Sequence, residues 1–297
     1  MGSNSNIAKP KLACEIAADR VLAGRLAADG RSLEACAARE LAPGCVIPDL
    51  VEANLRERES VKHAIQESLQ GMAQRSHDVV AIVPDAAVRV VLLEFDTLPS
   101  DVEEAASVVR FRMKKSLPFD VEKARVSYHV QKMDQGLRVV AAVALAGVIE
   151  DYESAFREAG FTPGVVLPSM LAALGAASGE RPTLVVKVDS RTTSIAILND
   201  DQLQLFRTLE NSRGGTVTGD QLAEEVYPSL VFFQDTYHLN IEKIFVAGVF
   251  DMAATAPVLH SQTGADVQEL VGSSQLGASD GPVPRWRMAG VLGALVS

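Results

Sequence analysis

Few residues in this sequence have the types and spacing needed for chemistry at a metal ion or an activated nucleophile. The chain has 297 residues but only 3 Cys and 5 His. It contains no Cys-x-x-Cys, no His-Glu-x-x-His and no Cys/His cluster, so neither a metal site nor a disulfide framework is predicted. We expect Cys14, Cys36 and Cys45 to be small buried apolar residues.

Three short stretches could instead contact a phosphate group or a cation. Gly214-Gly215 could cradle a phosphate or form a turn between a strand and a helix. Glu15 could be a metal carboxylate or an exposed acid in a turn. The hydroxyl side chains of residues 192–194 could bind phosphate or lie along a strand edge. In each case the residues by themselves favour the structural role.

A fourth stretch could bind a peptide. Arg110 and Lys114 precede the apolar turn Leu117-Pro118-Phe119, and an extended peptide with apolar side chains needs an apolar trough with basic groups beside it. The alternative is that Phe119 belongs to the core and that the basic residues form a solvated face.

Composition excludes several classes of protein. There are 28 Lys and Arg residues against 38 Asp and Glu, a formal net charge of −10, and so acidic a chain does not suit general binding of nucleic acid. The longest apolar run, 139–149, is too short for a membrane span. Residues 1–6 lack the apolar core of a signal peptide. We therefore expect a soluble, cytoplasmic protein.

The two halves of the chain repeat one pattern of elements. Residues 11–26 and 184–198 each read as strand, turn and strand, and placing Glu15 against Lys187 aligns them. Helices are expected over 49–75, 100–117, 149–159, 218–237 and 286–295. A capping box, Ser100-x-x-Glu103, predicts the start of the second of these helices. We expect Trp286 to anchor the last one in the core.

The order of five short sequence strings is more informative about the protein family than any one of the strings alone. They are residues 44–49 (Gly-Cys-Val-Ile-Pro-Asp), 83–85 (Val-Pro-Asp), 98–99 (Leu-Pro), 117–120 (Leu-Pro-Phe-Asp) and 244–248 (Ile-Phe-Val-Ala-Gly). In order and spacing they resemble the PilM family, the actin-like cytoplasmic proteins of type IV pilus assembly. The resemblance extends over most of the chain.

The resemblance implies an α/β protein with the split, two-lobed fold shared by actin, the heat-shock chaperones and sugar kinases. The first lobe is expected over 1–177, with an inserted α/β subdomain at about 86–147, and the second lobe over 178–297. Members normally carry a second-half insertion. Between Gly215 and Ile241 this chain has room for one helix only, so no such insertion is expected.

The resemblance also implies a scaffold at the inner membrane, held there by the short N-terminal cytoplasmic peptide of a PilN-like bitopic membrane protein. We expect this peptide at Arg110, Lys114, Leu117, Pro118 and Phe119, between the first subdomain and the insert. Pilus motor components are a further class of partner, and self-association is left open.

Many family members bind ATP between the lobes through an Asp-x-Gly at each of two turns. Here the first turn reads Glu15-x-Ala17, so the acid is kept and the glycine is lost. The second reads Lys187-x-Asp189, where a base replaces the acid and a carboxylate that repels phosphate replaces the glycine. Of a Gly-Gly-Gly run under the nucleobase, only Gly248 remains.

We therefore predict a degenerate nucleotide site, to which Gly214 and Gly215 also belong, with no catalytic residue, no metal and no cofactor: a pseudo-ATPase. Two alternatives stay open. One is an active actin-like ATPase with ATP and Mg²⁺ as cofactors, and the other is the cytoplasmic domain of an L-type protein of type II secretion. A sugar or acetate kinase is less favoured, because Asp189, the obvious catalytic acid, stands at a glycine position.

Overall fold

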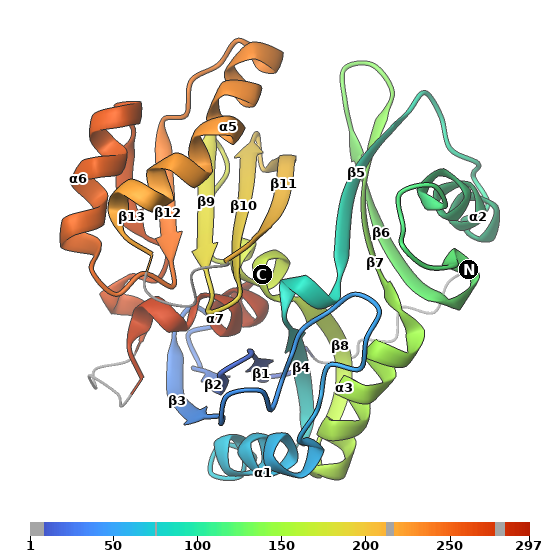
Figure 1. The fold of residues 1–297 in the computed structure, drawn as a ribbon, viewed down its shortest axis with the longest axis vertical. Coiled ribbons are helices and arrows are strands. Elements are labelled where there is room, and N and C mark those ends of the chain that lie inside the picture. The colour runs from blue at the N-terminus through green and yellow to red at the C-terminus, as the bar shows by residue number, and fades with distance from the viewer. Residues whose placement is uncertain (1–8, 75, 212–216, 277–282) are drawn as a thin grey trace.

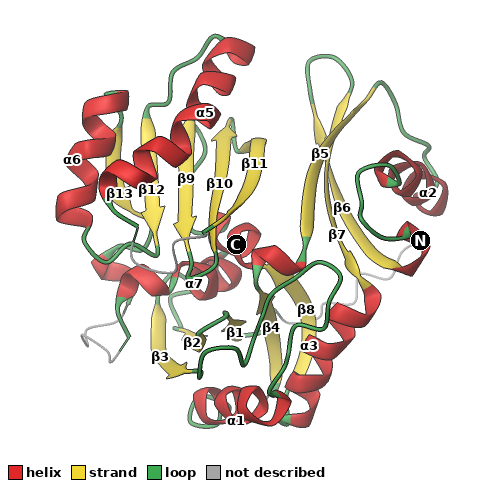
Figure 2. Ribbon diagram, viewed as in Figure 1, coloured by secondary structure: helices red, strands yellow, loops and turns green. Residues whose placement is uncertain are grey.

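Two five-stranded sheets and one three-stranded sheet make up the strands of the computed structural model (Figure 1, Figure 2). The structure describes residues 9–74, 76–211, 217–276 and 283–297. We call the two larger sheets the first sheet and the second sheet, in chain order, and the smallest the insert sheet.

The first sheet combines a meander with two parallel strands, in the order β3-β2-β1-β4-β8. Its strands are β1 (Leu12–Ile16), β2 (Arg20–Leu26), β3 (Leu33–Glu40), β4 (Asp78–Val83) and β8 (Thr162–Pro168). Strand β2 pairs antiparallel with β1 and β3, whereas β4 runs parallel to β1 and β8. All residues of β1 are buried, as in a central strand that is covered on both faces.

The second sheet repeats this arrangement in the order β11-β10-β9-β12-β13. Its strands are β9 (Thr183–Val188), β10 (Thr192–Asn199), β11 (Gln202–Glu210), β12 (Lys243–Ala247) and β13 (Asp266–Glu269). The turns after β1 and β9 are built alike: Ala17 N donates to Arg20 O at 2.8 Å, and Asp189 N donates to Thr192 O at 2.7 Å. The predicted alignment of the two halves is therefore confirmed.

The insert sheet lies between β4 and β8 in the sequence and has the antiparallel order β5-β7-β6. Its elements are β5 (Arg89–Phe95), α2 (Val102–Met113), β6 (Ala124–Lys132) and β7 (Leu137–Leu145). Val109 and Met113 of α2 pack with Val139, Ala141 and Val143 of β7. These elements fall within the range predicted for an inserted subdomain, and the division of the chain at 177 and 178 stays a prediction.

The start of α2 differs from the sequence prediction. Asp101 is the N-cap in place of Ser100, and its side chain accepts hydrogen bonds from the N–H groups of Glu103 and Glu104. Val102 is 74% exposed and lies outside the apolar face of the helix. Aspartate and serine are about equally good N-caps, so the residue types alone do not separate two adjacent candidates.

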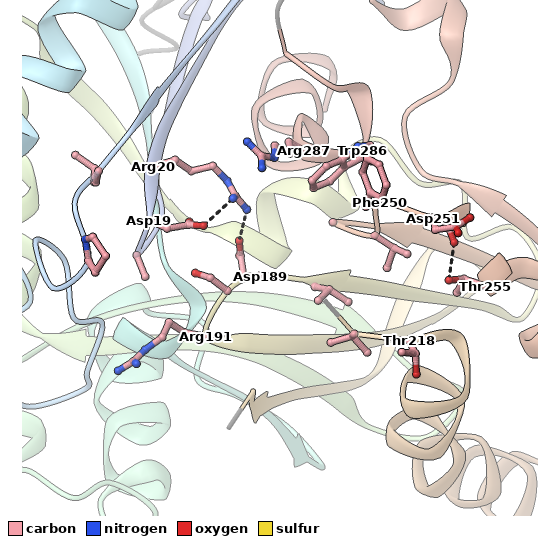
Figure 3. Close-up of a pocket in the computed structure, with 18 of the residues that line it drawn as sticks. Asp19, Arg20, Asp189, Arg191, Thr218, Phe250, Asp251, Thr255, Trp286 and Arg287 are labelled. Atoms are coloured by element: carbon pink, nitrogen blue, oxygen red, sulfur yellow. Dashed lines mark hydrogen bonds and ion pairs between the residues drawn. The ribbon is translucent and has the colours of Figure 1, made fainter. Parts of the chain in front are cut away.

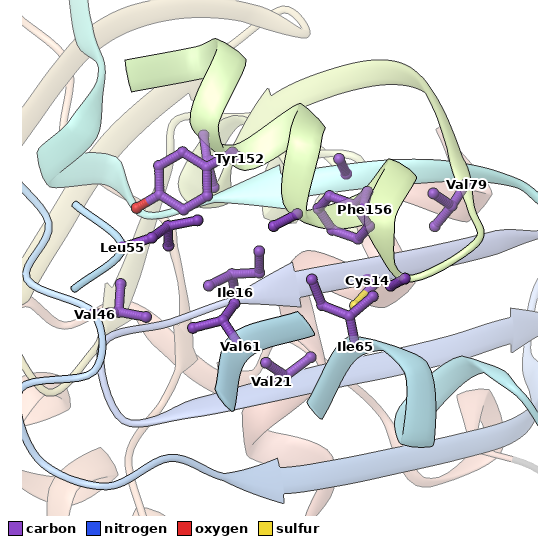
Figure 4. Packing of buried hydrophobic residues seen from close by; sticks show 14 of the residues in the cluster. Cys14, Ile16, Val21, Val46, Leu55, Val61, Ile65, Val79, Tyr152 and Phe156 are labelled. Atoms are coloured by element: carbon purple, nitrogen blue, oxygen red, sulfur yellow. The ribbon is translucent and has the colours of Figure 1, made fainter. Parts of the chain in front are cut away.

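Helices α1 (Arg58–Leu69) and α3 (Ala146–Glu158) cover one face of the first sheet. Ile65 of α1 and Phe156 of α3 are fully buried in the same cluster as Cys14 and Ile16 of β1 (Figure 4). This cluster fixes β1, and with it the turn that follows β1, to the rest of the first half.

The helix predicted over 49–75 is shorter in the structure. The residues before Arg58 include a loop in which the Asp49 carboxylate accepts hydrogen bonds from Val51 N at 2.7 Å and Glu52 N at 2.8 Å. An aspartate competes with helix formation in this way, because it satisfies nearby backbone donors itself.

Helices α4 (Ser169–Leu174) and α7 (Ala289–Val296) lie between the two larger sheets (Figure 1). Helix α7 packs on β1, β2 and α4, although it ends the chain. A Cβ on Gly293 would stand 2.2 Å from Ala172 O, so glycine is needed for this close approach of the two helices. Trp286 precedes α7 in a short 3-10 turn and is half-buried, which corrects its predicted place in the helix and the core.

Helices α5 (Gly219–Tyr237) and α6 (Met252–Thr263) cover the face of the second sheet that points away from α4 and α7. Helix α5 begins at a capping box formed by Thr218 and Gln221. In the described part of the chain it is the one helix between β11 and β12. Within the described ranges, no helix combines the length and the apolar character that crossing a membrane requires.

Candidate functional site

A buried ion pair joins the ends of β1 and β9, the middle strands of the two larger sheets. The Lys187 ammonium lies 3.1 Å from Glu15 Oε1 and 2.6 Å from Asp189 Oδ2. Glu15 is 2% exposed and Lys187 is 5% exposed. Because a charge in a protein interior is costly unless it is paired, these three side chains act as one ionic unit, which we call the turn cluster.

Neighbouring elements complete the contacts of the turn cluster. The Ser169 hydroxyl, at the start of α4, donates a hydrogen bond to Glu15 Oε1. The Arg20 guanidinium, at the start of β2, lies 2.8 Å from Asp19 Oδ2 and 3.6 Å from Asp189 Oδ1 (Figure 3). Two ion pairs therefore connect the halves of the repeat. In the pair of Glu15 and Lys187 the acid comes from the first half, and in the pair of Arg20 and Asp189 it comes from the second.

Two glycines at the site serve packing. A Cβ on Gly290 of α7 would lie 2.4 Å from Glu15 Oε2, so the glycine leaves room for this carboxylate. Gly248 has a φ of +80°, and a Cβ there would stand 1.8 Å from Val188 O. The backbone itself therefore requires the glycine that the sequence analysis placed near a nucleobase.

A further buried carboxyl group borders the turn cluster. Asp85, shortly after β4, accepts hydrogen bonds from Met170 N at 2.8 Å and from the Ser194 hydroxyl of β10 at 2.7 Å. Burial raises the pKa of Asp85 to about 6, and the Lys187 ammonium opposes this to a smaller extent. Ser194, which was considered for phosphate binding, thus links the second sheet to the loop after β4.

Within the turn cluster, Lys187 and Asp189 favour each other's charged form. Burial opposes the ammonium, but Asp189, Glu15 and Asp85 together raise the pKa of Lys187 above its usual range. Burial also opposes the Asp189 carboxylate, yet Lys187 holds the pKa of that carboxyl below its usual range. Among the described residues, no group of three or more His, Cys, Asp or Glu side chains is placed to hold a metal ion.

A cleft of about 760 Å³ opens beside the turn cluster, between the two larger sheets (Figure 3). Asp19 and Asp189 line it from the two turns, together with the start of α5. On the opposite side the Trp286 ring stands edge-on to Phe250, with ring centroids 6.2 Å apart. The cleft is large enough for a small ligand. Asp19, Arg20 and Asp189 of the two turns are paired with one another there, whereas Arg191 of the second turn is exposed at its wall.

The insert sheet also contacts the second half. Arg138 of β7 is buried and donates hydrogen bonds to the side-chain oxygen of Gln204 in β11 and to the Tyr237 hydroxyl, the latter at 3.0 Å. Its guanidinium also pairs with Glu94 at 3.0 Å. The insert sheet therefore bridges the first sheet, from which it emerges, and the second.

A separate cavity of about 320 Å³ lies between the first sheet and the insert sheet. Val126 and Ser127 of β6 line it together with Gly164 and Val166 of β8. Both β6 and β8 are outermost strands of their sheets, so each has one edge without a neighbouring strand. We call this cavity the β6–β8 groove.

Solved structures share this architecture, although no family model and no curated protein sequence matches the chain. A chain of the PilM–PilN type IV pilus biogenesis complex matches with a TM-score of 0.77 at 20% identity, over 97% of each chain. A Bacteroides thetaiotaomicron protein of unknown function, with an actin-like ATPase fold, matches with a TM-score of 0.53 at 12% identity, over 86% of this chain and 89% of that chain.

The fold is actin-like. The cytoplasmic domain of EpsL, an inner-membrane component of the type II secretion system of Vibrio cholerae, matches as well, with a TM-score of 0.54 at 10% identity, over 96% of this chain and 94% of that chain. The predicted actin-like α/β fold is therefore confirmed.

The actin-like fold brings most residues of the predicted nucleotide site together. Glu15, Lys187 and Asp189 form the turn cluster, Ala17 lies buried in the first turn, and Gly248 lines the cleft. The other two residues of that prediction, Gly214 and Gly215, lie outside the described residues.

Sequence reasoning missed two members of the site. Arg20 occupies the same place in its turn as Thr192 does in the other turn, so a comparison of the two turns could have singled out the additional charge. Asp85 follows the apolar strand β4 after one proline and ends the string Val83-Pro84-Asp85, which was quoted only for its resemblance. Neither residue type has a spacing signal of its own.

The five residues predicted to bind a peptide gather around the end of α2. Arg110 donates to two carbonyl oxygens near the start of β6, at 3.2 and 3.4 Å, and Phe119 packs against the core of the insert sheet. Leu117 is half-buried, whereas Lys114 and Pro118 are exposed. None of the five lines the β6–β8 groove.

We expect the substitution Lys187→Met to lower the free energy of unfolding by about 3–5 kcal/mol, because it leaves the buried Glu15 carboxylate without its cationic partner. Chemical denaturation near neutral pH measures the change. Lys114→Met, at an exposed position, is the matched control and should leave the free energy of unfolding almost unchanged. A loss below about 1 kcal/mol for Lys187→Met would show that the turn cluster is not needed for stability.

The pKa of Asp85 predicts a pH dependence of stability. Its folded-state pKa of about 6 lies above the ordinary 3.8, so the stability that this group contributes is present below about pH 4 and lost as the pH rises to about 6. Asp85→Asn should therefore gain stability relative to the unsubstituted chain between about pH 4 and pH 7, by up to about 3 kcal/mol. Urea unfolding of both proteins at about pH 4 and pH 7 checks this. If the difference in free energy of unfolding between them is the same at the two pH values, the prediction is contradicted.

Proposed function

We propose that this chain is a non-enzymatic scaffold of a type IV pilus or related secretion assembly, a PilM-like protein whose nucleotide site is degenerate. The observation that carries the proposal is the turn cluster, in which the two turns that would hold phosphate in an actin-like ATPase bind each other. The likeness to a chain of the PilM–PilN complex supports the assignment to pilus assembly.

The turn cluster does not fit a complex of phosphate and magnesium. Mg²⁺ needs carboxylate or water oxygens at close to octahedral geometry, but Glu15 and Asp189 are both engaged with the Lys187 ammonium. A phosphate needs free N–H donors and positive charge, but Asp189 places a carboxylate in the second turn. A ligand that displaced Lys187 would also leave a buried ammonium without its partners, which is strongly unfavourable.

Two other functions are supported by specific observations. The cleft of about 760 Å³, with the exposed Arg191 and the ring of Trp286 at its wall, favours an active actin-like ATPase that uses altered turns. The match to EpsL favours a secretion protein of the L type, with a lower TM-score than the pilus match. Binding of nucleotide separates the first of these from the scaffold.

We expect calorimetric titration to find no saturable binding of ATP, with or without Mg²⁺, at nucleotide concentrations up to about 1 mM. The reason is that the Lys187 ammonium is already paired with Glu15 and Asp189, and that the Asp189 carboxylate in the second turn repels phosphate. Circular dichroism on the same sample controls for folding. Micromolar, Mg²⁺-dependent binding that Glu15→Gln abolishes would overturn the pseudo-ATPase and establish the active ATPase in its place.

We further propose that the β6–β8 groove takes the N-terminal cytoplasmic peptide of a PilN-like bitopic membrane protein. An extended peptide can add to the free edge of a strand through its main chain, while its side chains enter apolar pockets. Val126, Ala142 and Val166 supply an apolar lining, and the pair of Arg125 and Glu153, 2.6 Å apart, supplies a polar border. Such a tether would hold the chain at the cytoplasmic side of the inner membrane.

The substitution Gly164→Leu tests the groove without disturbing the fold. A Cβ on Gly164 meets no atom within 4 Å and its φ is not left-handed, so the new side chain projects into open space at the groove. We expect binding of a fluorescent peptide, taken from the N-terminus of a PilN-like bitopic membrane protein, to weaken at least about tenfold at unchanged Tm.

Gly147→Leu is the matched control, because Gly147 is equally open but does not line the groove, and it should leave peptide binding unchanged. The double substitution Lys114→Glu, Phe119→Ala tests the placement predicted from the sequence. A loss of peptide binding in that variant alone, with folding intact, would move the peptide site to the end of α2.

A further inference from the structure

The outward face of α2 combines a fully presented aromatic ring with basic side chains. Phe111 is 79% exposed, and on a helix its neighbours are the residues three and four positions away. These are Ser107, Val108, Lys114 and Lys115, all of them exposed. The face opposite the insert sheet therefore presents an apolar centre bordered by two lysines.

The charge of this segment is opposite to that of the molecule. The chain as a whole carries −10, but between Ala105 and Phe119 there are four basic residues and no acidic one. Arg110 is directed inward to backbone carbonyls, and the Arg112 guanidinium lies over the Phe95 ring of β5, 5.9 Å from its centroid. This leaves the exposed Lys114 and Lys115. In the part of the chain that the structure describes, no ion pair neutralises these two side chains.

The shape of this face decides which partner suits it. Helix α2 packs on the insert sheet from the side opposite the second half, so its outward face is convex and open (Figure 1). None of these exposed residues lines the cleft or the β6–β8 groove. A convex face with a phenylalanine among lysines suits an extended surface, where the ring enters the interface of a bilayer and the ammonium groups meet anionic headgroups.

We propose that the outward face at the end of α2, made of Val108 and Phe111 of the helix and of Lys114 and Lys115 directly after it, docks on the anionic surface of a phospholipid bilayer. This goes beyond the proposed function, with which it shares only the location next to a membrane. A single weak lipid contact gives reversible attachment, and a second tether, such as a bound peptide of a membrane protein, would make the attachment stable.

Vesicle co-sedimentation of the full chain, with no peptide present, tests the proposal. We expect binding to vesicles of phosphatidylglycerol and phosphatidylethanolamine at about 0.1 M NaCl, and little binding to phosphatidylcholine vesicles. Phe111→Ser and the double substitution Lys114→Glu, Lys115→Glu should each reduce binding to the anionic vesicles about tenfold or more. All three positions are exposed, so an unchanged Tm is expected and is measured alongside.

Matched controls separate this face from general effects. Tyr227→Ser removes another exposed aromatic ring, on α5, and Lys11→Glu with Arg56→Glu makes the same change of net charge at exposed positions elsewhere. Both should bind vesicles like the unsubstituted chain. Absence of binding to anionic vesicles, equal binding to phosphatidylcholine, or equal losses in the controls would each overturn the proposal. Because the Gly164→Leu peptide assay contains no lipid, its outcome reports on the proposed function separately.

Discussion

The ion pair between Glu15 and Lys187 is the constraint on which the arrangement of the two larger sheets depends. Both groups lie in the interior, where an unpaired charge is far more costly than at the surface, so neither turn can move away without the other. The internal repeat makes this pairing available, because it places an acid and a base at equivalent positions of two equivalent turns. Side chains of the chain itself therefore join the two sheets at these turns, where a bound ligand would otherwise have to connect them.

Other contacts across the same junction follow the same principle. Arg20 pairs with Asp189 across the turns, Asp85 accepts a hydrogen bond from Ser194, and Arg138 connects the insert sheet to the second half. Each is a polar group that burial makes dependent on a partner from another part of the chain. These contacts therefore hold the two halves and the insert sheet in one arrangement.

The insert sheet has a central place in this picture. One of its faces is covered by α2, whose outer side carries Phe111 and the lysines, and its edge strand β6 borders the groove beside β8. The two proposed contacts, with a peptide and with a lipid surface, therefore both involve this sheet, whereas the cleft lies between the two larger sheets. The two proposed contacts are thus separate in space from the cleft.

The sequence by itself determined the elements and their repetition, since alternation and helical spacing are local patterns that each segment carries within itself. The strand–turn–strand units and the alignment of Glu15 with Lys187 could both be predicted. The start of α1 and the choice of Asp101 over Ser100 could not, because adjacent caps and turns compete on nearly equal terms. Only the tertiary structure decided that Lys187 neutralises Glu15, that Asp85 and Arg20 join them, and that Phe111 rather than Phe119 faces outward. These contacts depend on packing between residues far apart in the chain, and such packing cannot be predicted from a local sequence pattern.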